Sequence, residues 1–362
     1  MSRLFEPIEI RGVTIPNRMW ISPMCQYSCF AGDGIPTDWH LVHLGAFAQG
    51  GFGYITTEAA AVNSTGRISP EDAGIWNDDQ RDAWKRVVDF VHSQDAIIGI
   101  QIAHAGRKAS SHSPFPGNPS GAILPQDGGW TPVGPTSEPF PGYESSPEQL
   151  DDAGIQQVID DFRAAAVRSK EAGFDVIEIH AAHGYLLHSF YSPISNTRTD
   201  EWGGDFEGRT RLVLAVTDAV REVWDGPLFV RISATDWLDN GWTIEDSVRL
   251  AQLLKDHGVD LIDSSSGSVV PADIPIGPGY QVPLAHRIYE EVDILVGAVG
   301  LITEPEQAES ILMKEQADAV FLGRVALREP HWPQRAAAEL GVPRNEAPYR
   351  PQHVRGAWPR SR

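Results

Sequence analysis

The sequence predicts an α/β fold: a single closed (β/α)₈ barrel, with a β-hairpin before it and a long loop insertion after the third barrel strand. Eight short apolar runs alternate along the chain with amphipathic segments of helical period. The runs are almost continuously apolar, which is typical of parallel strands covered on both faces. The chain has 362 residues, and such a barrel needs ~250 residues plus insertions.

The hairpin comes first, because apolar and polar residues alternate on either side of Arg11-Gly12. Helices are predicted over residues 79–93, 155–172 and 244–257, where apolar residues recur three and four positions apart. Gly173 and Gly258 follow the second and third of these segments, as glycines that end helices do. The eight predicted strands are residues 19–25, 53–60, 97–104, 174–180, 228–234, 260–265, 294–300 and 319–324.

An open, doubly wound sheet is the competing arrangement. It normally carries a Gly-x-Gly-x-x-Gly turn after its first strand, and this chain has none there. We find no internal repeat and no linker, so we expect one domain over residues 1–362. Residues 110–146 form a Pro/Gly/Ser-rich insertion, which we expect to shape the mouth of a pocket. Residues 331–362 follow the last strand as a tail.

Composition argues against several classes of protein. The formal net charge of −20 disfavours binding to nucleic acid and to anionic membranes. No apolar stretch approaches the ~20 residues that span a bilayer, and the N-terminus lacks the apolar region of a signal peptide. Two cysteines, Cys25 and Cys29, do not make a secreted disulfide framework. We therefore expect a cytoplasmic protein.

The last three predicted strands end in small or cationic residues. In a barrel, binding and catalytic groups lie at the C-terminal ends of the strands, and the last strands usually hold phosphate. Glycine and serine let backbone N–H groups approach an anion, and arginine adds charge-assisted hydrogen bonds. The residues concerned are Ser265, Gly300, Gly323 and Arg324. They predict a binding site for the phosphate group of a ligand.

The other strand ends carry groups that donate hydrogen bonds or exchange protons. The fourth strand runs into His180, and His183 and Tyr185 follow directly. Arg231 lies inside an apolar run, and a buried guanidinium needs a partner, either a carboxylate or a ligand that becomes anionic, such as a flavin. Further polar groups at strand ends are Ser22, Cys25, Gln101 and His104. Together they predict a polar pocket beside the phosphate-binding site.

Some of these residue types have other common uses in proteins. Paired histidines bind metals, with His188 as a third candidate, but a zinc site needs three or four ligands and no acidic residue or cysteine nearby completes the set. We therefore expect no metal. Histidines at strand ends, and small thiols such as Cys25, also serve as structural core residues. The co-occurrence of polar groups at eight strand ends favours a functional site.

Six segments resemble, in order and spacing, the old yellow enzyme family of FMN-dependent ene reductases, from about residue 4 to residue 330. With a cysteine, Cys25, in the first segment, the chain resembles the thermophilic-like bacterial subclass of the family, which includes the xenobiotic reductases. The segments are SPMCQYS at 22–28, EAAAVNSTGR at 58–67, QIAHAGRK at 101–108, HAAHGYLLHSFYSPISNTRTDEWGGDFEGR at 180–209, GAVG at 297–300 and GR at 323–324.

The resemblance implies a bound FMN, with NADPH, or else NADH, as the hydride donor. It implies that Ala59 packs on the flavin ring, Gln101 bonds its pyrimidine edge, Arg231 lies by N1 and O2, and the Cys25 thiol tunes its potential. The implied cofactor-binding residues are Ser22, Pro23, Met24, Cys25, Ala59, Gln101, Arg231, Ser265, Gly300, Gly323 and Arg324.

The resemblance also implies an activated alkene as substrate: an enone, enal, maleimide or nitroalkene. His180 and His183 would donate hydrogen bonds to its activating oxygen, Tyr185 would protonate the α-carbon, and Tyr27 would contact the substrate. Members of the subclass often end in Arg-Gly-Trp, whose arginine reaches a neighbouring active site. This chain reads Arg-Gly-Ala-Trp from Arg355. Arg355 is thus a substrate-binding candidate in a homodimer or homotetramer.

The residues alone leave two other functions possible. A phosphate-binding barrel lyase would normally carry a Schiff-base lysine or a metal carboxylate set at a strand end, whereas the lysines fall in predicted helices or loops. A non-catalytic, flavin-binding redox sensor would keep the cofactor site without turning over an alkene. The lysines concerned are Lys85, Lys108, Lys170, Lys255 and Lys314.

Overall fold

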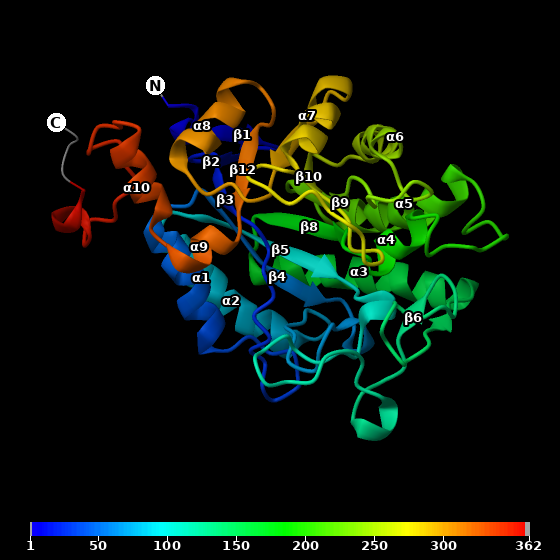
Figure 1. Cartoon of the computed structure of the whole chain (residues 1–362). Helices are drawn as coiled ribbons and strands as arrows, with labels where there is room; N and C mark the ends of the chain where they lie inside the picture. Colours follow the sequence, from blue (N-terminus) through cyan, green and yellow to red (C-terminus); the bar gives the residue numbers. More distant parts are fainter. Residues whose placement is uncertain (1, 359–362) are drawn as a thin grey trace.

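The computed structural model describes residues 2–358, and its centre is a closed barrel of eight parallel strands (Figure 1). Neighbouring barrel strands follow one another along the chain, and the last pairs with the first. The strands are β3 (Met19–Ile21), β4 (Tyr54–Ala61), β5 (Ile97–Ala103), β8 (Val176–Ala181), β9 (Leu228–Ser233), β10 (Leu261–Ser265), β11 (Leu295–Ala298) and β12 (Ala319–Leu322). The predicted (β/α)₈ barrel of the TIM type is confirmed.

Each barrel strand overlaps one of the eight predicted runs, but the ends differ. The first run was predicted to extend to residue 25, whereas β3 ends at Ile21. Pro23 has no N–H to donate to a parallel neighbour, so a strand does not continue through it. Residues 22–25 therefore lie in the loop at the mouth of the barrel, where they are free to face a ligand.

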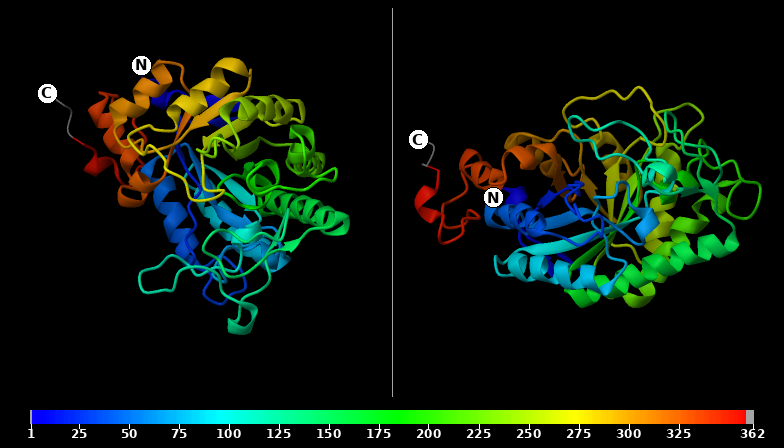
Figure 2. Two further views of the ribbon diagram at one scale, coloured as in Figure 1. Left: turned by 45° about the vertical axis from the view of Figure 1, so that its right-hand side comes forward. Right: turned by 90° about the horizontal axis from the view of Figure 1, so that it is seen from below.

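Helices surround the barrel between successive strands (Figure 2). The three predicted helices are present as α2, α3 and α6, and Gly173 ends α3 with a left-handed backbone at φ 90°. The helices are α1 (Asp38–Gly50), α2 (Asp78–His92), α3 (Asp152–Ala172), α4 (Leu186–Tyr191), α5 (Phe206–Val223), α6 (Ile244–Asp256), α7 (Val282–Glu291), α8 (Pro305–Met313), α9 (Arg324–Arg328) and α10 (Trp332–Glu339).

The predicted hairpin is present and plugs the end of the barrel where the strands begin. It consists of β1 (Ile8–Ile10) and β2 (Val13–Ile15), joined by Arg11 and Gly12 with left-handed backbones. Its buried isoleucines pack on a cluster of side chains that fill the lower barrel. The aromatic members of that cluster are Trp20, Tyr54, Phe229 and Phe321.

The insertion 110–146 follows a largely irregular path outside the barrel. Its short strand β6 (Val133–Gly134) pairs with β7 (Glu148–Gln149) just beyond it. The tail passes through α10 and projects from the side of the molecule, ending in a short turn at Val354–Gly356 (Figures 1 and 2). Within residues 2–358, every helix is too short or too polar to cross a bilayer.

Candidate active site

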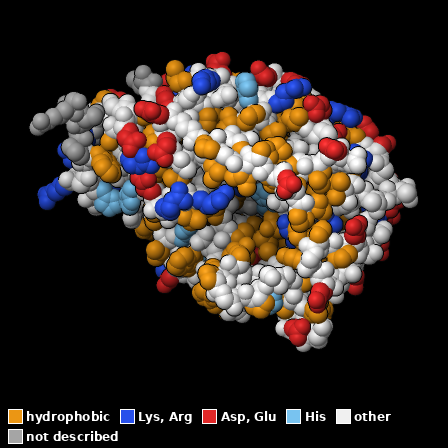
Figure 3. All heavy atoms as spheres, in the orientation of Figure 1, with side chains coloured by type: hydrophobic (Ala, Val, Ile, Leu, Met, Phe, Trp, Pro, Cys, Tyr) orange, Lys and Arg blue, Asp and Glu red, His pale blue; other side chains and the backbone are white. Residues whose placement is uncertain are grey.

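A cavity of about 290 Å³ opens where the barrel strands end. In Figure 3 a hollow lies near the centre of the face shown, with basic side chains beside it. The cavity brings together residues from both ends of the sequence, because β12 pairs with β3. The sequence-predicted residues that line it are Ser22, Met24, Arg231, Ser265, Gly300, Gly323 and Arg324.

The part of the cavity beside β12 suits a phosphate. Helix α9 begins there, and the first N–H groups of a helix have no partner within it. A Cβ atom at Gly323 would lie in ordinary van der Waals contact with Met24 and Ser22, with its nearest neighbour at 3.8 Å. Arg324 and Arg328 line the same region. On a chain of net charge −20, this local positive group fits an anionic cofactor.

Arg231 has the carboxylate partner that the sequence left open. Its Nε lies 3.1 Å from Oδ2 of Asp263, which pairs with it across β9 and β10. Burial raises the pKa of Asp263 to about 6, and the guanidinium opposes that rise. Because the guanidinium also lines the cavity, Arg231 can serve a ligand and Asp263 together.

His180 presents one N–H donor. Its ring is buried, with 4% exposure, and its Nδ1 accepts a hydrogen bond of 3.3 Å from the N–H of Ala182. The proton of the neutral ring is therefore on Nε2. Burial lowers the pKa of His180 well below its ordinary value. The ring centroid lies 5.2 Å from that of His183 and 5.0 Å from that of Tyr185, so the three form one group.

His183 reaches from the β8 loop toward β10. Its backbone is left-handed, with φ 59°, and its N–H donates to Oγ of Ser233 at 2.8 Å. Its Nε2 lies 2.7 Å from Oγ of Ser265, a residue predicted to hold the phosphate. Burial lowers the pKa of His183 well below the ordinary value, so this ring is neutral too.

Tyr185 faces two features that the sequence did not single out. The ammonium of Lys108 lies 5.2 Å above its ring and donates to the carbonyl oxygens of His183 and Ser268 at 2.9 and 3.2 Å. A small cavity, also lined by Ala59, lies against Tyr185. Burial raises the pKa of the phenol well above its ordinary value, which keeps the group protonated at neutral pH.

The loop after β3 is anchored by Glu58. Its Oε2 accepts the N–H of Gln26 at 3.0 Å, between Cys25 and Tyr27. Tyr27 has a left-handed backbone, φ 50°, and its ring contacts Phe115 of the insertion with centroids 6.0 Å apart. Burial raises the pKa of the Cys25 thiol well above its ordinary value, so the sulfur carries a proton at neutral pH.

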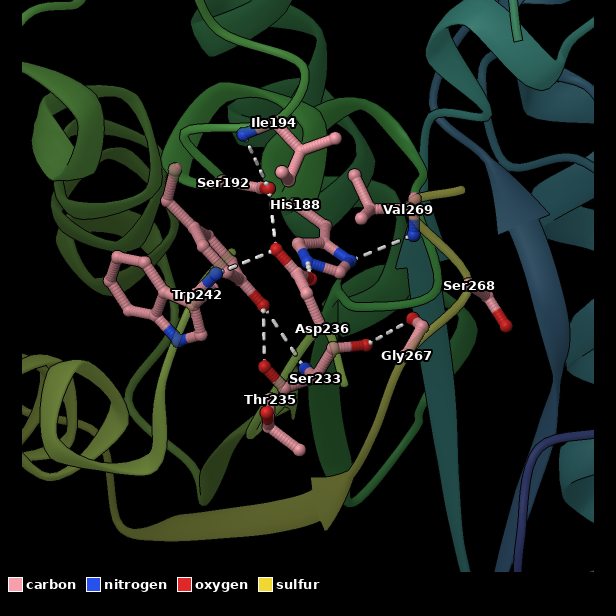
Figure 4. A network of polar contacts seen from close by, with 12 residues as sticks. His188, Ser192, Ile194, Ser233, Thr235, Asp236, Trp242, Gly267, Ser268 and Val269 are labelled. Atoms are coloured by element: carbon pink, nitrogen blue, oxygen red, sulfur yellow. Dashed lines mark hydrogen bonds and ion pairs between the residues drawn. The ribbon is translucent and has the colours of Figure 1, made fainter. Parts of the chain in front are cut away.

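His188, the candidate third metal ligand, supports the site instead. Its Nδ1 accepts the N–H of Gly184 at 2.8 Å, and its Nε2 lies 2.9 Å from Oδ1 of Asp236 (Figure 4). The other oxygen of Asp236 accepts hydrogen bonds from Ser192 and from the N–H of Trp242. This buried network ties the β8 loop that carries His183 and Tyr185 to the loop after β9.

Not every predicted residue lies at the cavity. Gln101 lies deeper in the barrel and donates to Glu178 at 2.7 Å. Arg355 lies in the exposed tail and is not among the residues that line the cavity of its own chain. Conversely, the loop after β10 adds Tyr280 and Gln281 to the cavity wall. Their only sequence signal is their position after a predicted strand.

A parallel barrel whose mouth holds a cavity lined by arginines, beside two neutral histidines and a protonated tyrosine, has the layout of an enzyme active site. The chain belongs to the NADH:flavin oxidoreductase / NADH oxidase family, whose model matches residues 3–342. Similar proteins include the NADPH dehydrogenase of Geobacillus sp. (strain WCH70), 50% identical over 94% of this chain and 95% of the relative. The NADPH dehydrogenase of Bacillus subtilis (strain 168) is 44% identical over 98% and 99%.

Solved structures agree with this family. Morphinone reductase in complex with tetrahydroNAD aligns with a TM-score of 0.78 at 28% identity, over 95% of this chain and 92% of that one. The old yellow enzyme homologue from Zymomonas mobilis aligns with a TM-score of 0.78 at 26% identity, over 98% and 99%. The resemblance found in the sequence is confirmed: the protein is a flavin oxidoreductase of the old yellow enzyme type.

Proposed function

We propose that this protein is an FMN-dependent ene reductase that uses NADPH to reduce activated alkenes, namely enones, enals, maleimides or nitroalkenes. The observation that carries the proposal is the neutral group of His180, His183 and Tyr185 at the mouth of a barrel with a phosphate-binding wall. Bound FMN would supply the redox chemistry, by accepting hydride from NADPH and delivering it to the β-carbon of the alkene.

The residues that would hold FMN are distributed along the cavity. Gly323, Arg324 and Gly300, with Ser265, would bind the phosphate end, and Arg231 would lie by N1 and O2 of the ring. Ser22, Pro23 and Met24 would line the ring, Ala59 would pack on it, and Gln101 would bond its pyrimidine edge. The protonated thiol of Cys25 would tune its potential without adding a charge.

The two histidines would bind the activating oxygen of the alkene. His180 offers Nε2–H directly, because Nδ1 is occupied by Ala182. His183 would exchange its contact with Ser265 for the substrate oxygen. As negative charge grows on that oxygen, two positioned N–H donors in a buried site stabilise it, as an oxyanion hole does.

Tyr185 would complete the reduction by giving its phenolic proton to the α-carbon. The raised pKa keeps that proton available at neutral pH. The ammonium of Lys108 above the ring would stabilise the phenolate that forms. Tyr27, held against Phe115 of the insertion, would contact the substrate from the loop after β3, and the insertion would thereby shape the mouth.

The tail would act between subunits. We propose a homodimer or homotetramer in which Arg355, exposed on its own chain, reaches the substrate in a neighbouring barrel. The projection of the tail away from its own barrel supports this arrangement (Figure 2).

Anaerobic absorbance of the purified holoenzyme tests the proposal. Bleaching of the flavin by NADPH, followed by recovery of its colour with 2-cyclohexenone, would demonstrate both half-reactions. Bleaching without recovery would support a bound flavin but contradict the alkene as its substrate, and it would favour a non-catalytic redox sensor. If the protein neither contained nor took up FMN, the proposal would be refuted, and the phosphate-binding barrel lyase would become the favoured function.

A further inference from the structure

A layer of polar side chains lies inside the barrel between the aromatic cluster and the cavity. Alternate residues of a strand point to the same side, so Phe229 faces into the aromatic cluster and Arg231, two positions on, reaches the cavity. Asp263 on β10 is the register partner of Arg231, and Gln101 on β5 is the register partner of Glu178 on β8, which in turn lies opposite Phe229 on β9. All four polar side chains are buried.

The mechanism uses neither Asp263 nor Glu178 from this layer, and Asp263 already pairs with Arg231, so Glu178 is the member whose role is open. It is 0% exposed, and its Oε1 accepts the hydrogen bond of 2.7 Å from Nε2 of Gln101, its register partner on β5. Within residues 2–358, its Oε2 has no hydrogen-bond partner. A fully buried carboxyl group with one unpartnered oxygen costs folding free energy. Such a cost points to a role for Glu178 beside its neighbour Gln101.

We propose that Glu178 is a positioning residue of the flavin site: it holds the amide nitrogen of Gln101, so that the Gln101 carbonyl oxygen is the group presented to the flavin, and it adds an ionisable carboxyl group to the buried layer that contains Arg231. The inference rests on the proposed function, in which Gln101 meets the pyrimidine edge of FMN.

The orientation follows from donor and acceptor chemistry. An amide side chain offers one acceptor oxygen and an NH2 group with two N–H donors. Because one of these N–H groups is held by Glu178, the amide is fixed with its nitrogen toward Glu178, which leaves the carbonyl oxygen as the acceptor for a ligand. The pyrimidine ring of a flavin carries an N–H that needs such an acceptor. The opposite orientation would set two donors against each other. The oxygen of Glu178 accepts from Gln101 whether the carboxyl group is ionised or protonated, so this role holds across pH.

The charge of Glu178, in contrast, depends on pH. Burial raises the pKa of Glu178 to about 8; Asp263 on β10 adds to the rise, whereas Arg231 on β9 and the Gln101 bond oppose it. Tyr54 on β4 is a further titratable group close enough to interact with its charge. Ionisation of Glu178 at higher pH puts a second carboxylate beside Arg231. That negative charge disfavours the reduced flavin, which is itself negative near N1.

Two variants separate the two roles. Glu178→Gln keeps an acceptor for Gln101 but removes the charge. Its midpoint potential should follow that of the wild type near pH 6 and lie above it at about pH 9 and higher, because only the wild type ionises there. Glu178→Leu removes the acceptor, and its dissociation constant for FMN should rise ~10-fold, the equivalent of one lost hydrogen bond.

Asp318→Asn is the matched control. It neutralises a half-buried carboxylate at the start of β12, the opposite end of that strand from Gly323, and should leave the potential curve unchanged in shape. Parallel potential curves for wild type and Glu178→Gln would overturn the charge role, and an unchanged FMN affinity in Glu178→Leu would overturn the positioning role. Should Glu178→Leu not fold, Glu178→Met replaces it. A wild type that binds no FMN would instead refute the proposed function.

Discussion

The phenol of Tyr185 is protonated at neutral pH and has the ammonium of Lys108 above its ring, so it can act as a proton donor. We expect Tyr185→Phe to slow the oxidation of reduced enzyme by an enone ~10²- to 10⁴-fold, because general acid catalysis contributes about that much. Reduction of the flavin by NADPH should be unchanged. Stopped-flow absorbance measures the two half-reactions separately. If the variant slowed both equally, Tyr185 would not be the donor.

His180 and His183 are expected to act as neutral donors. Replacement of either by alanine should lower kcat/KM for the alkene ~10²-fold, the usual effect of losing one oxyanion donor, and should weaken alkene binding. Because burial keeps both pKa values low, alkene binding should not change between about pH 6 and about pH 8 through these rings. Wild-type turnover in both variants would contradict the role.

His104 gives a test of stability rather than of catalysis. Its ring is buried beside Gly66, accepts the N–H of Gly106, and has a pKa lowered by burial to about 4. The unfolded chain binds a proton there near pH 6.5 and the folded chain does not, so His104 costs stability as pH falls below that value. The free energy of unfolding should lose ~1.4 kcal/mol per pH unit through this residue until about pH 4.

Urea unfolding of wild type and His104→Asn measures this contribution as a difference. The advantage of the wild type over the variant should shrink as the pH is lowered from about 7 to about 5. A difference that stays constant over that range would show that His104 takes up its proton equally in both states.

At the scale of elements, strand ends were easier to predict than loops. Ser22, Gly300 and Gly323 could be assigned to one site because parallel barrel strands all finish at the same end. Lys108 and Gln281 could not, since a loop residue reaches the site only through a backbone path that no local pattern encodes. Helix α1 was also missed: its buried residues include His40, Gly45 and Gly50, which do not form an apolar stripe.

The tail is the element whose role depends on a second subunit. Arg355→Ala and Tyr185→Phe should each be poor ene reductases, and a mixture that exchanges subunits should regain activity. One site of each mixed dimer would combine an intact Tyr185 with the intact Arg355 of its neighbour. Activity after mixing, measured beside the oligomer size by sedimentation, tests this. Mixtures no more active than their components would show that Arg355 acts within its own chain or not at all.

For the whole molecule, the fold was predictable because one unit recurs eight times. Each apolar run and each amphipathic segment carried a weak signal, and their alternation carried a strong one. The position of the hairpin was not predictable, because its isoleucines indicate that one face is buried but do not indicate which part of the molecule covers that face. That residues 1–362 form one domain stays a prediction.

The hairpin plug should contribute to global stability without touching the cofactor. Ile15 is fully buried against the aromatic cluster. Ile15→Ala should lower the free energy of unfolding by ~2–5 kcal/mol through the cavity it leaves, with FMN affinity unchanged at the other end of the barrel. Urea unfolding and flavin titration measure the two quantities. A loss of FMN affinity would show that the two ends of the barrel are coupled.

The hairpin plug and the aromatic cluster fill the end of the barrel where the strands begin, and the cavity opens at the other end. In the proposed reaction, NADPH, the alkene, NADP⁺ and the saturated product would all use the mouth of the barrel, one after the other. The two reactants would then compete for the same opening. An excess of alkene would delay the binding of NADPH, and slow release of NADP⁺ would block the binding of the alkene. The filled lower barrel, with the hairpin packed against it, would thereby impose the alternation of binding and release during turnover.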